Sequence, residues 1–354
     1  MAAPDQLARF PSSGASASAQ HVLVLPEDVD IEEIEALALS RFPSARWDTA
    51  DADLRASARG RGERGYAPVR VLRLSRHSRL VGPYALELAD TTRLGVNVSA
   101  STAFVVETPP DRGERPYPGG DREGINRAFP DGLPVRDEER VVRWLVAVAR
   151  RVGGSVRIAP SGVVLSPDVH AEIDLTVYTD VWLEPQAALE VMRRVAPGAQ
   201  LAMDPVAWAG PPPGIGETGA PGTTGLSAAL RKHLHAEADA FDVAALSAPD
   251  ELNGYGVQKD LGVDGALLLE VAGEDVLPLV LRSLPWAQDG AVTYRVHWEP
   301  PEFEELERER PSFAHRVARD RVENLVGALT REVHRAVGGE VMDSAEFLVD
   351  PADL

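Results

Sequence analysis

The chain has 354 residues, of which 44% are hydrophobic and 26% charged, and its 55 acidic against 36 basic side chains give a formal net charge of −19. This acidic excess disfavours phosphate backbones and anionic lipid surfaces, so we expect neither a nucleic acid nor a membrane as a partner. The absence of cysteine excludes thiolate nucleophiles, disulfide bonds and cysteine-ligated metals.

Lysine chemistry is nearly excluded as well, because Lys232 and Lys259 are the only lysines in the chain. A Schiff base with a carbonyl substrate or with pyridoxal phosphate would need one of these two side chains. Neither lysine follows a GxxxxG segment, as the phosphate-binding lysine of a P-loop does. We therefore predict no cofactor.

The first 20 residues, Met1–Gln20, are rich in Ser, Ala, Gly and Pro, which predicts a disordered leader. They lack the charged start and the apolar run of a secretory signal. No later segment approaches the roughly 20 apolar residues that a membrane-spanning helix requires. Together these features predict a soluble, cytoplasmic protein.

The first half of the chain has the periodicity of alternating strands and helices. A helix over Asp28–Arg41 places apolar residues on one face, and a second helix, which we expect Asp137 to cap, carries Val141, Leu145, Val148 and Val152 at helical spacing. Gly153 can adopt the left-handed conformation that ends such a helix. Strands are expected at His21–Leu25, Val69–Leu74, Tyr84–Ala89 and Val96–Glu107.

The second half repeats this scheme with longer elements. Helices are expected over Gln186–Ala196, Glu274–Leu284 and Ser312–Val337, and the last has apolar residues at positions 322, 326, 329, 333 and 337. Strands are expected at Ile173–Leu183, Ala266–Ala272 and Val292–Trp298.

Short motifs recur in the same order in both halves, which indicates an internal duplication. The second half repeats the first in the pairs Leu86–Ala89 with Leu269–Ala272, Val105–Pro110 with Val296–Pro301, Gly65–Tyr66 with Gly254–Tyr255, and Pro167–Asp168 with Pro351–Asp353. Both long helices also end at a Val-Gly-Gly sequence. Each match alone is weak because Ala, Val, Gly and Pro are abundant, so coincidence stays open as the alternative.

Consecutive strands favour antiparallel pairing, so the predicted fold class is α+β. We expect a disordered leader over residues 1–20, followed by two tandem similar lobes over residues 21–168 and 169–354. Each lobe is predicted to be a mostly antiparallel sheet with helices packed on one face, and the two lobes to be related by a pseudo-twofold axis. The second lobe carries a Gly/Pro-rich insertion near residues 208–253.

Several motifs in this insertion have ordinary explanations. Gly214–Gly219 matches GxGxxG, but flanking prolines prevent a helix from starting there, so a flexible insertion is favoured over a dinucleotide site. Ser227 lacks the second glycine of a nucleophile elbow and is better explained as a helix N-cap. The pairs His233/Glu237 and His235/Asp239 point to different sides of a helix, which favours surface pairing over one shared site.

His170, Glu172 and Asp174 form the set that we consider for catalysis. Alternate residues of a strand share a face, so an imidazole and two carboxylates would line up. Such a set binds a divalent metal or pairs an acid with a base. The favoured alternative is the solvated face of a half-buried strand, because the intervening residues are apolar, and we expect no metal.

Two further polar groups are His297 with Glu299, and His77 among Arg73, Arg76 and Arg79. The loops Asp111–Arg136 and Glu299–Pro311 occupy equivalent places in the two halves. Loops of this length are usually functional or disordered, so this pair marks the expected binding surface, with a plain mobile loop as the alternative.

The sequence thus favours a non-enzymatic binding or interaction protein, whose partner is a protein or a small molecule. A metal-dependent or acid–base hydrolase that uses His170, Glu172 and Asp174 is the second hypothesis. A third is a structural pseudo-dimer that associates with itself.

Overall fold

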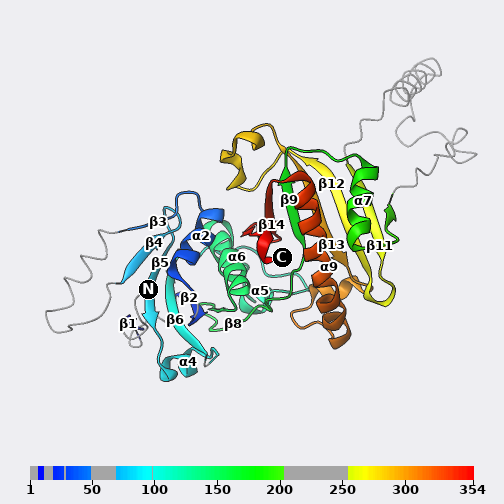
Figure 1. Cartoon of the computed structure of the whole chain (residues 1–354). Coiled ribbons are helices and arrows are strands. Elements are labelled where there is room, and N and C mark those ends of the chain that lie inside the picture. The colour runs from blue at the N-terminus through cyan, green and yellow to red at the C-terminus, as the bar shows by residue number, and fades with distance from the viewer. Residues whose placement is uncertain (1–6, 12–18, 28, 49–68, 98, 203–253) are drawn as a thin grey trace, which may run out of the picture.

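The computed structural model describes residues 7–11, 19–27, 29–48, 69–97, 99–202 and 254–354. Within these residues the chain forms two antiparallel sheets and six α-helices, so the architecture is α+β, as predicted (Figure 1). None of the described helices is both long and apolar enough to cross a membrane.

The first sheet follows the order β3-β4-β5-β6-β2-β7-β8, and β1 adds to β5 in parallel. Its strands are β1 (Ala8–Arg9), β2 (His21–Pro26), β3 (Arg46–Trp47), β4 (Arg70–Arg73), β5 (Arg79–Ala85), β6 (Ala100–Glu107), β7 (Ser155–Arg157) and β8 (Val164–Leu165). The helices of this lobe are α2 (Ile31–Arg41), α4 (Leu88–Leu94), α5 (Ile125–Ala128) and α6 (Arg136–Arg151).

The second sheet follows the order β10-β11-β12-β13-β9-β14-β15. Its strands are β9 (Leu175–Thr179), β10 (Gln200–Leu201), β11 (Gly254–Asp260), β12 (Ala266–Glu274), β13 (Ala291–Glu299), β14 (Glu340–Asp343) and β15 (Leu348–Val349). Its helices are α7 (Pro185–Val195) and α9 (Phe313–Val337). Taken by their order along the chain, the strands of β2–β8 and β9–β15 occupy the same positions in their two sheets.

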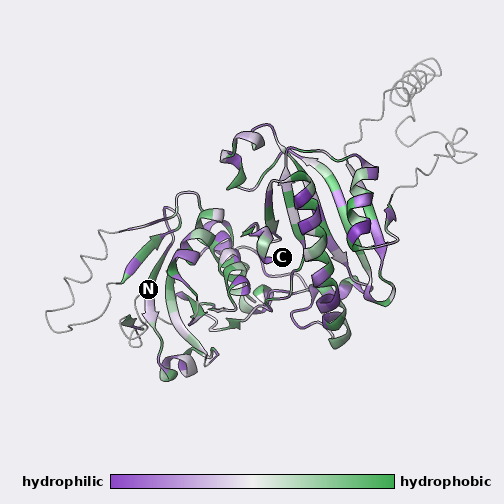
Figure 2. Cartoon of the chain, in the orientation of Figure 1, coloured by the Kyte–Doolittle hydropathy of each residue, from purple (hydrophilic) through white to green (hydrophobic). Residues whose placement is uncertain are grey.

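The two long helices form where the apolar periodicity predicts them. Each buries one stripe against its sheet, and Figure 2 shows hydrophobic and hydrophilic residues alternating around both. Gly153 follows α6 with φ of 66°, as expected for the left-handed residue that ends a helix, whereas Gly338 follows α9 with φ of 68° and ψ of −151°, outside the left-handed helical region. The predicted cap is displaced by two positions: Val135 is the N-cap of α6, and Asp137 lies in the first turn, where it accepts hydrogen bonds from Ser75 and Ser78.

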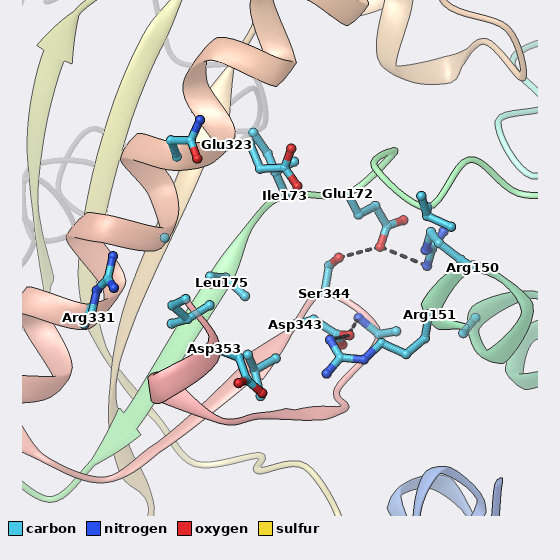
Figure 3. Close-up of a pocket in the computed structure, with 17 residues that line it drawn as sticks. Arg150, Arg151, Glu172, Ile173, Leu175, Glu323, Arg331, Asp343, Ser344 and Asp353 are labelled. Atoms are coloured by element: carbon cyan, nitrogen blue, oxygen red, sulfur yellow. Dashed lines mark hydrogen bonds and ion pairs between the residues drawn. The ribbon is translucent and has the colours of Figure 1, made fainter. Parts of the chain in front are cut away.

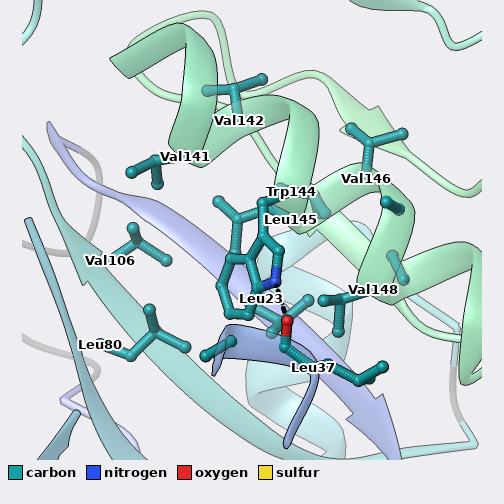
Figure 4. Close-up of a cluster of buried hydrophobic side chains, with 14 of the residues drawn as sticks. Leu23, Leu37, Leu80, Val106, Val141, Val142, Trp144, Leu145, Val146 and Val148 are labelled. Atoms are coloured by element: carbon teal, nitrogen blue, oxygen red, sulfur yellow. Dashed lines mark hydrogen bonds between the residues drawn. The ribbon is translucent and has the colours of Figure 1, made fainter. Parts of the chain in front are cut away.

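The main core of the first lobe lies between its sheet and the helices α2 and α6. The indole N–H of Trp144 on α6 donates to the backbone oxygen of Leu37 on α2 at 2.9 Å, which satisfies the only polar atom of this ring (Figure 4). The inner face of the sheet supplies Leu23, Leu80 and Val106, each 1% exposed or less.

The opposite face of the first sheet is also covered, which differs from the expectation of helices on one face only. Phe10 and, from α4, Leu94 pack there against β-strand valines. Residues 7–11 therefore belong to the fold rather than to a disordered leader. The Ser/Ala-rich composition did not indicate this, because only two apolar side chains, Leu7 and Phe10, anchor the segment.

One sequence match does not join equivalent positions. β5 spans Arg79–Ala85 and α4 begins at Leu88, so the predicted strand Tyr84–Ala89 is misplaced and shares only Tyr84 and Ala85 with β5. Leu269–Ala272, in contrast, lies in the middle of β12. The predicted helix Glu274–Leu284 is also wrong, because its described residues form the end of β12 and a short 3-10 turn.

The two lobes share one stretch of core. The turn between β14 and β15 belongs to the second sheet, yet Ala345 and Phe347 are buried in the main core of the first lobe, with Phe347 only 1% exposed. Arg41 of α2 donates to the backbone oxygen of Ala345 at 2.7 Å and pairs with Glu346 at 3.0 Å. The turn thus completes the first lobe, and Figure 1 shows β14 lying between the lobes.

We predict that Phe347→Ala lowers the free energy of unfolding by about 3–5 kcal/mol, because it leaves a cavity in the core of the other lobe. Leu348→Ala is the matched control: its side chain is 49% exposed, and we expect a change within about 0.5 kcal/mol. Urea denaturation measures both values. Equal effects of the two substitutions would contradict a structural role for the turn.

Candidate functional site

A cleft of about 570 Å³ lies between the lobes (Figure 3). Its walls are the end of α6, one face of α9, the segment that enters β9, and the turn between β14 and β15. Its apolar lining includes Ala147, Val169, Ile173, Leu175 and Val349, and its charged lining consists of Arg150, Arg151, Glu172, Glu323, Arg331, Asp343 and Asp353. The lining of the cleft therefore combines apolar side chains with charged side chains of both signs.

Helical spacing explains how these side chains come together. Glu323, Gly327 and Arg331 are four residues apart along α9 and so lie on one face of it. Gly327 between the two charged residues lets Leu354 pack against α9, where a Cβ at position 327 would lie 3.8 Å from the Leu354 backbone. Arg150 and Arg151 lie in the last turn of α6, where the helix dipole favours cations.

Glu172 links the two lobes at the edge of the cleft. Its carboxylate pairs with Arg150 of α6 at 2.9 Å and with Arg122 at 3.7 Å, and it accepts a hydrogen bond from the Ser344 hydroxyl in the β14–β15 turn. Arg150 is 9% exposed and also lies 3.4 Å from Glu123. These contacts fix Glu172 as a connector whose oxygens are already engaged.

Asp343 holds the turn that carries Phe347. Its Oδ1 accepts the backbone N–H groups of Ala345 and Phe347 at 2.9 Å each, and its Oδ2 lies 3.7 Å from Arg151. Burial raises the pKa of the Asp343 carboxyl, against the opposing effect of these hydrogen bonds and arginines. The β14–β15 turn, which forms another wall of the cleft, is therefore also held by contacts within the protein.

Arg331 differs from the other arginines of the cleft. It is half-buried, and in the described part of the chain no carboxylate lies within ion-pair distance of it. Arg150 and Arg151, in contrast, are each paired. Within the described residues, Arg331 is thus the arginine of the cleft lining without an ion-pair partner.

The structure separates the three residues considered for catalysis. The strand expected from Ile173 begins only at Leu175, so residues 170–174 do not share a strand face. His170 is exposed and lies 3.2 Å from Glu323, Glu172 makes the contacts described above, and Asp174 turns to the outer face of the second sheet. No group of three or more His, Asp or Glu side chains in the described residues is arranged to hold a metal ion.

Asp174 instead lies near His297, another histidine singled out from the sequence. Asp174 accepts the backbone N–H of Trp298 at 3.1 Å, and burial raises its pKa. His297 is 7% exposed and lies 3.8 Å from Glu270 and 4.0 Å from Glu299, beyond hydrogen-bond distance. The second group, around His77, is dispersed: His77 is exposed, while Arg73 pairs with Asp48 and Arg79 with Glu107.

The two loops expected to form a binding surface contact each other. The N–H of Asp121 donates to the backbone oxygen of Glu307 at 2.9 Å, and Arg127 pairs with Glu309 at 2.6 Å. The first loop also lines a second cavity of about 370 Å³, which shares Glu172 with the cleft. The loops therefore contribute to the junction between the lobes.

Sequence reasoning missed Arg331, Arg151 and Asp343. The helical spacing of Glu323 and Arg331 was visible, but no pattern within α9 shows that the facing wall comes from the other lobe.

The motifs at Gly65–Tyr66, Gly214–Gly219, Ser227, Lys232, His233/Glu237 and His235/Asp239 lie outside the described residues. Comparisons with protein-family models, with curated proteins and with solved structures found no match for the chain.

A buried polar network fixes the loop that follows β6. The backbone N–H of Ala159 donates to Nδ1 of His21 at 3.1 Å, so the neutral imidazole carries its proton on Nε2 and donates it to Glu138 at 3.2 Å. Glu138, 1% exposed, also pairs with Arg112 and accepts the N–H of Asp111 at 2.7 Å. Burial and the charge of Arg112 lower the pKa of His21 to about 4.

This shift predicts a pH dependence of stability. The unfolded histidine takes up a proton near pH 6.5 and the folded one only near pH 4, so the stabilisation is complete above pH 6.5 and is lost as the pH falls to 4. The loss from this residue is about 3 kcal/mol. Denaturation of the protein and of His21→Gln between pH 4 and 7 measures it.

His21→Gln should not show this loss of unfolding free energy between pH 6.5 and pH 4, whatever its stability at pH 7. His170→Gln is the control, because this exposed histidine lies outside the buried network, and the loss of stability attributed to His21 should persist in this variant. Identical slopes for His21→Gln and the unsubstituted protein would contradict the assignment.

Proposed function

We propose that this protein binds a ligand in the cleft between its lobes and is not an enzyme. The ligand chemistry that fits is an anionic group attached to an apolar body. The observation that carries the proposal is Arg331, a half-buried guanidinium that lines the cleft beside an apolar floor without a carboxylate partner in the described residues. A cytoplasmic location, expected from the sequence, is part of the same proposal.

The size of the cleft supports this function. Sites for small molecules usually enclose about 300–1,000 Å³ and are mainly apolar, with a few polar groups that orient the ligand. The cleft has about 570 Å³, and Ile173, Leu175 and Val349 line it together with the charged residues. A carboxylate or phosphate on the ligand would pair with Arg331 and leave the rest of the ligand on this apolar surface.

A tandem duplication explains why the cleft lies where it does. The identical strand orders, the matching positions of α2 with α7 and of α6 with α9, and the contact between equivalent loops all support two repeated lobes facing each other across a pseudo-twofold axis. Binding sites commonly form where two similar units meet, because the junction is concave and both units contribute side chains.

The hydrolase hypothesis requires free acid and base groups at one place. Glu172 is engaged by two arginines and a hydroxyl, and His170 and Asp174 lie with different partners. The geometry therefore favours binding over acid–base catalysis by these three residues. Self-association stays a further proposal, for which light scattering over a range of concentrations is the direct measurement.

We predict that N-acetylated trileucine with a free carboxylate binds more tightly than its C-terminal amide, as measured by isothermal titration calorimetry. Arg331→Gln should weaken binding of the acid about tenfold or more, since a hydrogen bond to a charged group contributes about 1.5–3 kcal/mol. The affinity for the amide should stay the same.

Arg335→Gln is the matched control, one turn further along α9, where the arginine is exposed and pairs with Glu332. This variant should bind the acid as the unsubstituted protein does. Equal affinities for acid and amide would contradict the proposed ligand class. Turnover of ester or amide substrates that EDTA abolishes would overturn the binding function in favour of a hydrolase.

A further inference from the structure

The outer face of the first sheet, opposite α2 and α6, is apolar. It presents Val22 and Val24 of β2, Val71 of β4, Val81 of β5, and Ala103 and Val105 of β6, all 5% exposed or less. The corresponding face of the second sheet carries Gln258, Glu270 and Arg295, all exposed. Two sheets of the same strand order thus differ in polarity on this face, and only the first needs an apolar cover.

Residues 7–11 form part of that cover. Phe10 is 4% exposed and packs edge-on against Tyr84 with ring centroids 6.1 Å apart, and Leu7 is 8% exposed. Arg9 between them points to solvent, with its guanidinium 3.5 Å from the carboxylate of Glu87. Two apolar side chains three positions apart therefore anchor the segment.

An unpaired stretch of sheet edge holds the backbone of this segment. β4 pairs with β5 only as far as Gly82, while β6 occupies the other edge of β5 through Ala85. β1 takes the remaining edge in parallel, with Ala8 opposite Tyr84, and the N–H of Phe10 donates to the backbone oxygen of Ala85 at 3.1 Å. Pro11 follows and cannot donate a backbone hydrogen bond, so the pairing stops there.

The geometry points to a peptide-binding groove that residues 7–11 occupy in cis. We propose that it accepts an extended segment of a partner protein with two apolar residues three positions apart and a basic residue before the second. The basic residue is specified by Glu87, which is 58% exposed beside Arg9, and it suits the net charge of −19. Addition of a strand to a free sheet edge, with side-chain pockets for selectivity, is an established mode of peptide recognition.

The cis segment is small enough to be displaced. Only Ala8 and Arg9 are paired as strand residues, and only Leu7 and Phe10 are buried. A tethered segment competes with a free peptide at a millimolar effective concentration, which weakens the binding of any partner until the segment leaves. This site lies on the face of the first lobe away from the inter-lobe cleft and does not depend on the proposed function.

The test uses a fluorescent peptide with the sequence of residues 7–11, acetylated at its N terminus, and measures its anisotropy with the full-length chain. The Leu7→Ser/Phe10→Ser variant should bind the peptide at least tenfold more tightly than the unsubstituted chain, because its own segment no longer occupies the groove. A peptide with Ser in place of both apolar residues should not bind. Arg115→Gln, which removes an exposed arginine outside the groove, is the control and should resemble the unsubstituted chain.

Circular dichroism of the double variant completes the experiment. A folded variant with unchanged peptide affinity would overturn the proposal. Loss of the sheet signal would overturn it too, because the segment would then be an integral part of the core and not a replaceable strand. Glu87→Lys in the double variant should weaken binding of the Arg-containing peptide, which distinguishes this groove from nonspecific adhesion to apolar surface.

Discussion

The aromatic ring of Phe347 is buried in the core that α2 and α6 form with the first sheet, although its turn joins two strands of the second sheet. Removal of this side chain from water couples the folding of the lobes, because the first core is complete only when the second lobe is in place. Asp343 shapes the turn through its backbone hydrogen bonds, and Arg41 ties it to α2. The same contact sets one wall of the inter-lobe cleft, so the geometry of the proposed site depends on it.

Charged residues of both lobes lie around the turn that carries Phe347. Glu172 receives Arg150 and Arg122 from the first lobe and Ser344 from the second, so one carboxylate satisfies groups from both sides. Such a partly buried carboxylate is stable only with several partners. Glu172 thereby connects the two sides of the cleft, whereas Arg331 has no carboxylate within ion-pair distance among the described residues.

Similar topology does not make the lobes equivalent. The strand orders agree, yet the outer face of the first sheet is apolar and carries residues 7–11, and that of the second sheet is polar around Arg295 and Glu270. The turn after β14 enters the opposite lobe, while Ile158 in the corresponding turn after β7 packs into the core of its own lobe. The two sheets therefore share a strand order but bury different surfaces.

Local periodicity predicted most of the elements, because amphipathic patterns report which face of a helix or strand is buried. The stripe of α9 from Val322 to Val337 and the positive φ of Gly153 after α6 are examples. The failures share a cause: local sequence does not say which distant surface a residue meets. His170 to Asp174 alternate as a strand does, but packing against α6 and α9 takes them out of the sheet.

The site was less predictable than the fold. His21 and Glu138 are 117 residues apart, and neither position shows from its neighbours that the other is its partner. The sequence around Phe347 resembles that of any short β-hairpin. Its burial in the first lobe depends on how the two lobes pack together. Contacts of this kind are determined by tertiary packing. For this reason His170, Glu172 and Asp174, which were chosen for their spacing, do not lie together. Glu172 instead connects the two lobes at the cleft.

Native-state hydrogen exchange tests the coupling of the lobes most directly. We predict that the most protected amides of β2 and α6 exchange with the same free energy as those of β12 and β13, and that the two sets converge on one global unfolding transition in low concentrations of denaturant. Exchange of the first lobe at a lower free energy, while the second lobe stays protected, would show that the lobes unfold separately and would contradict the account.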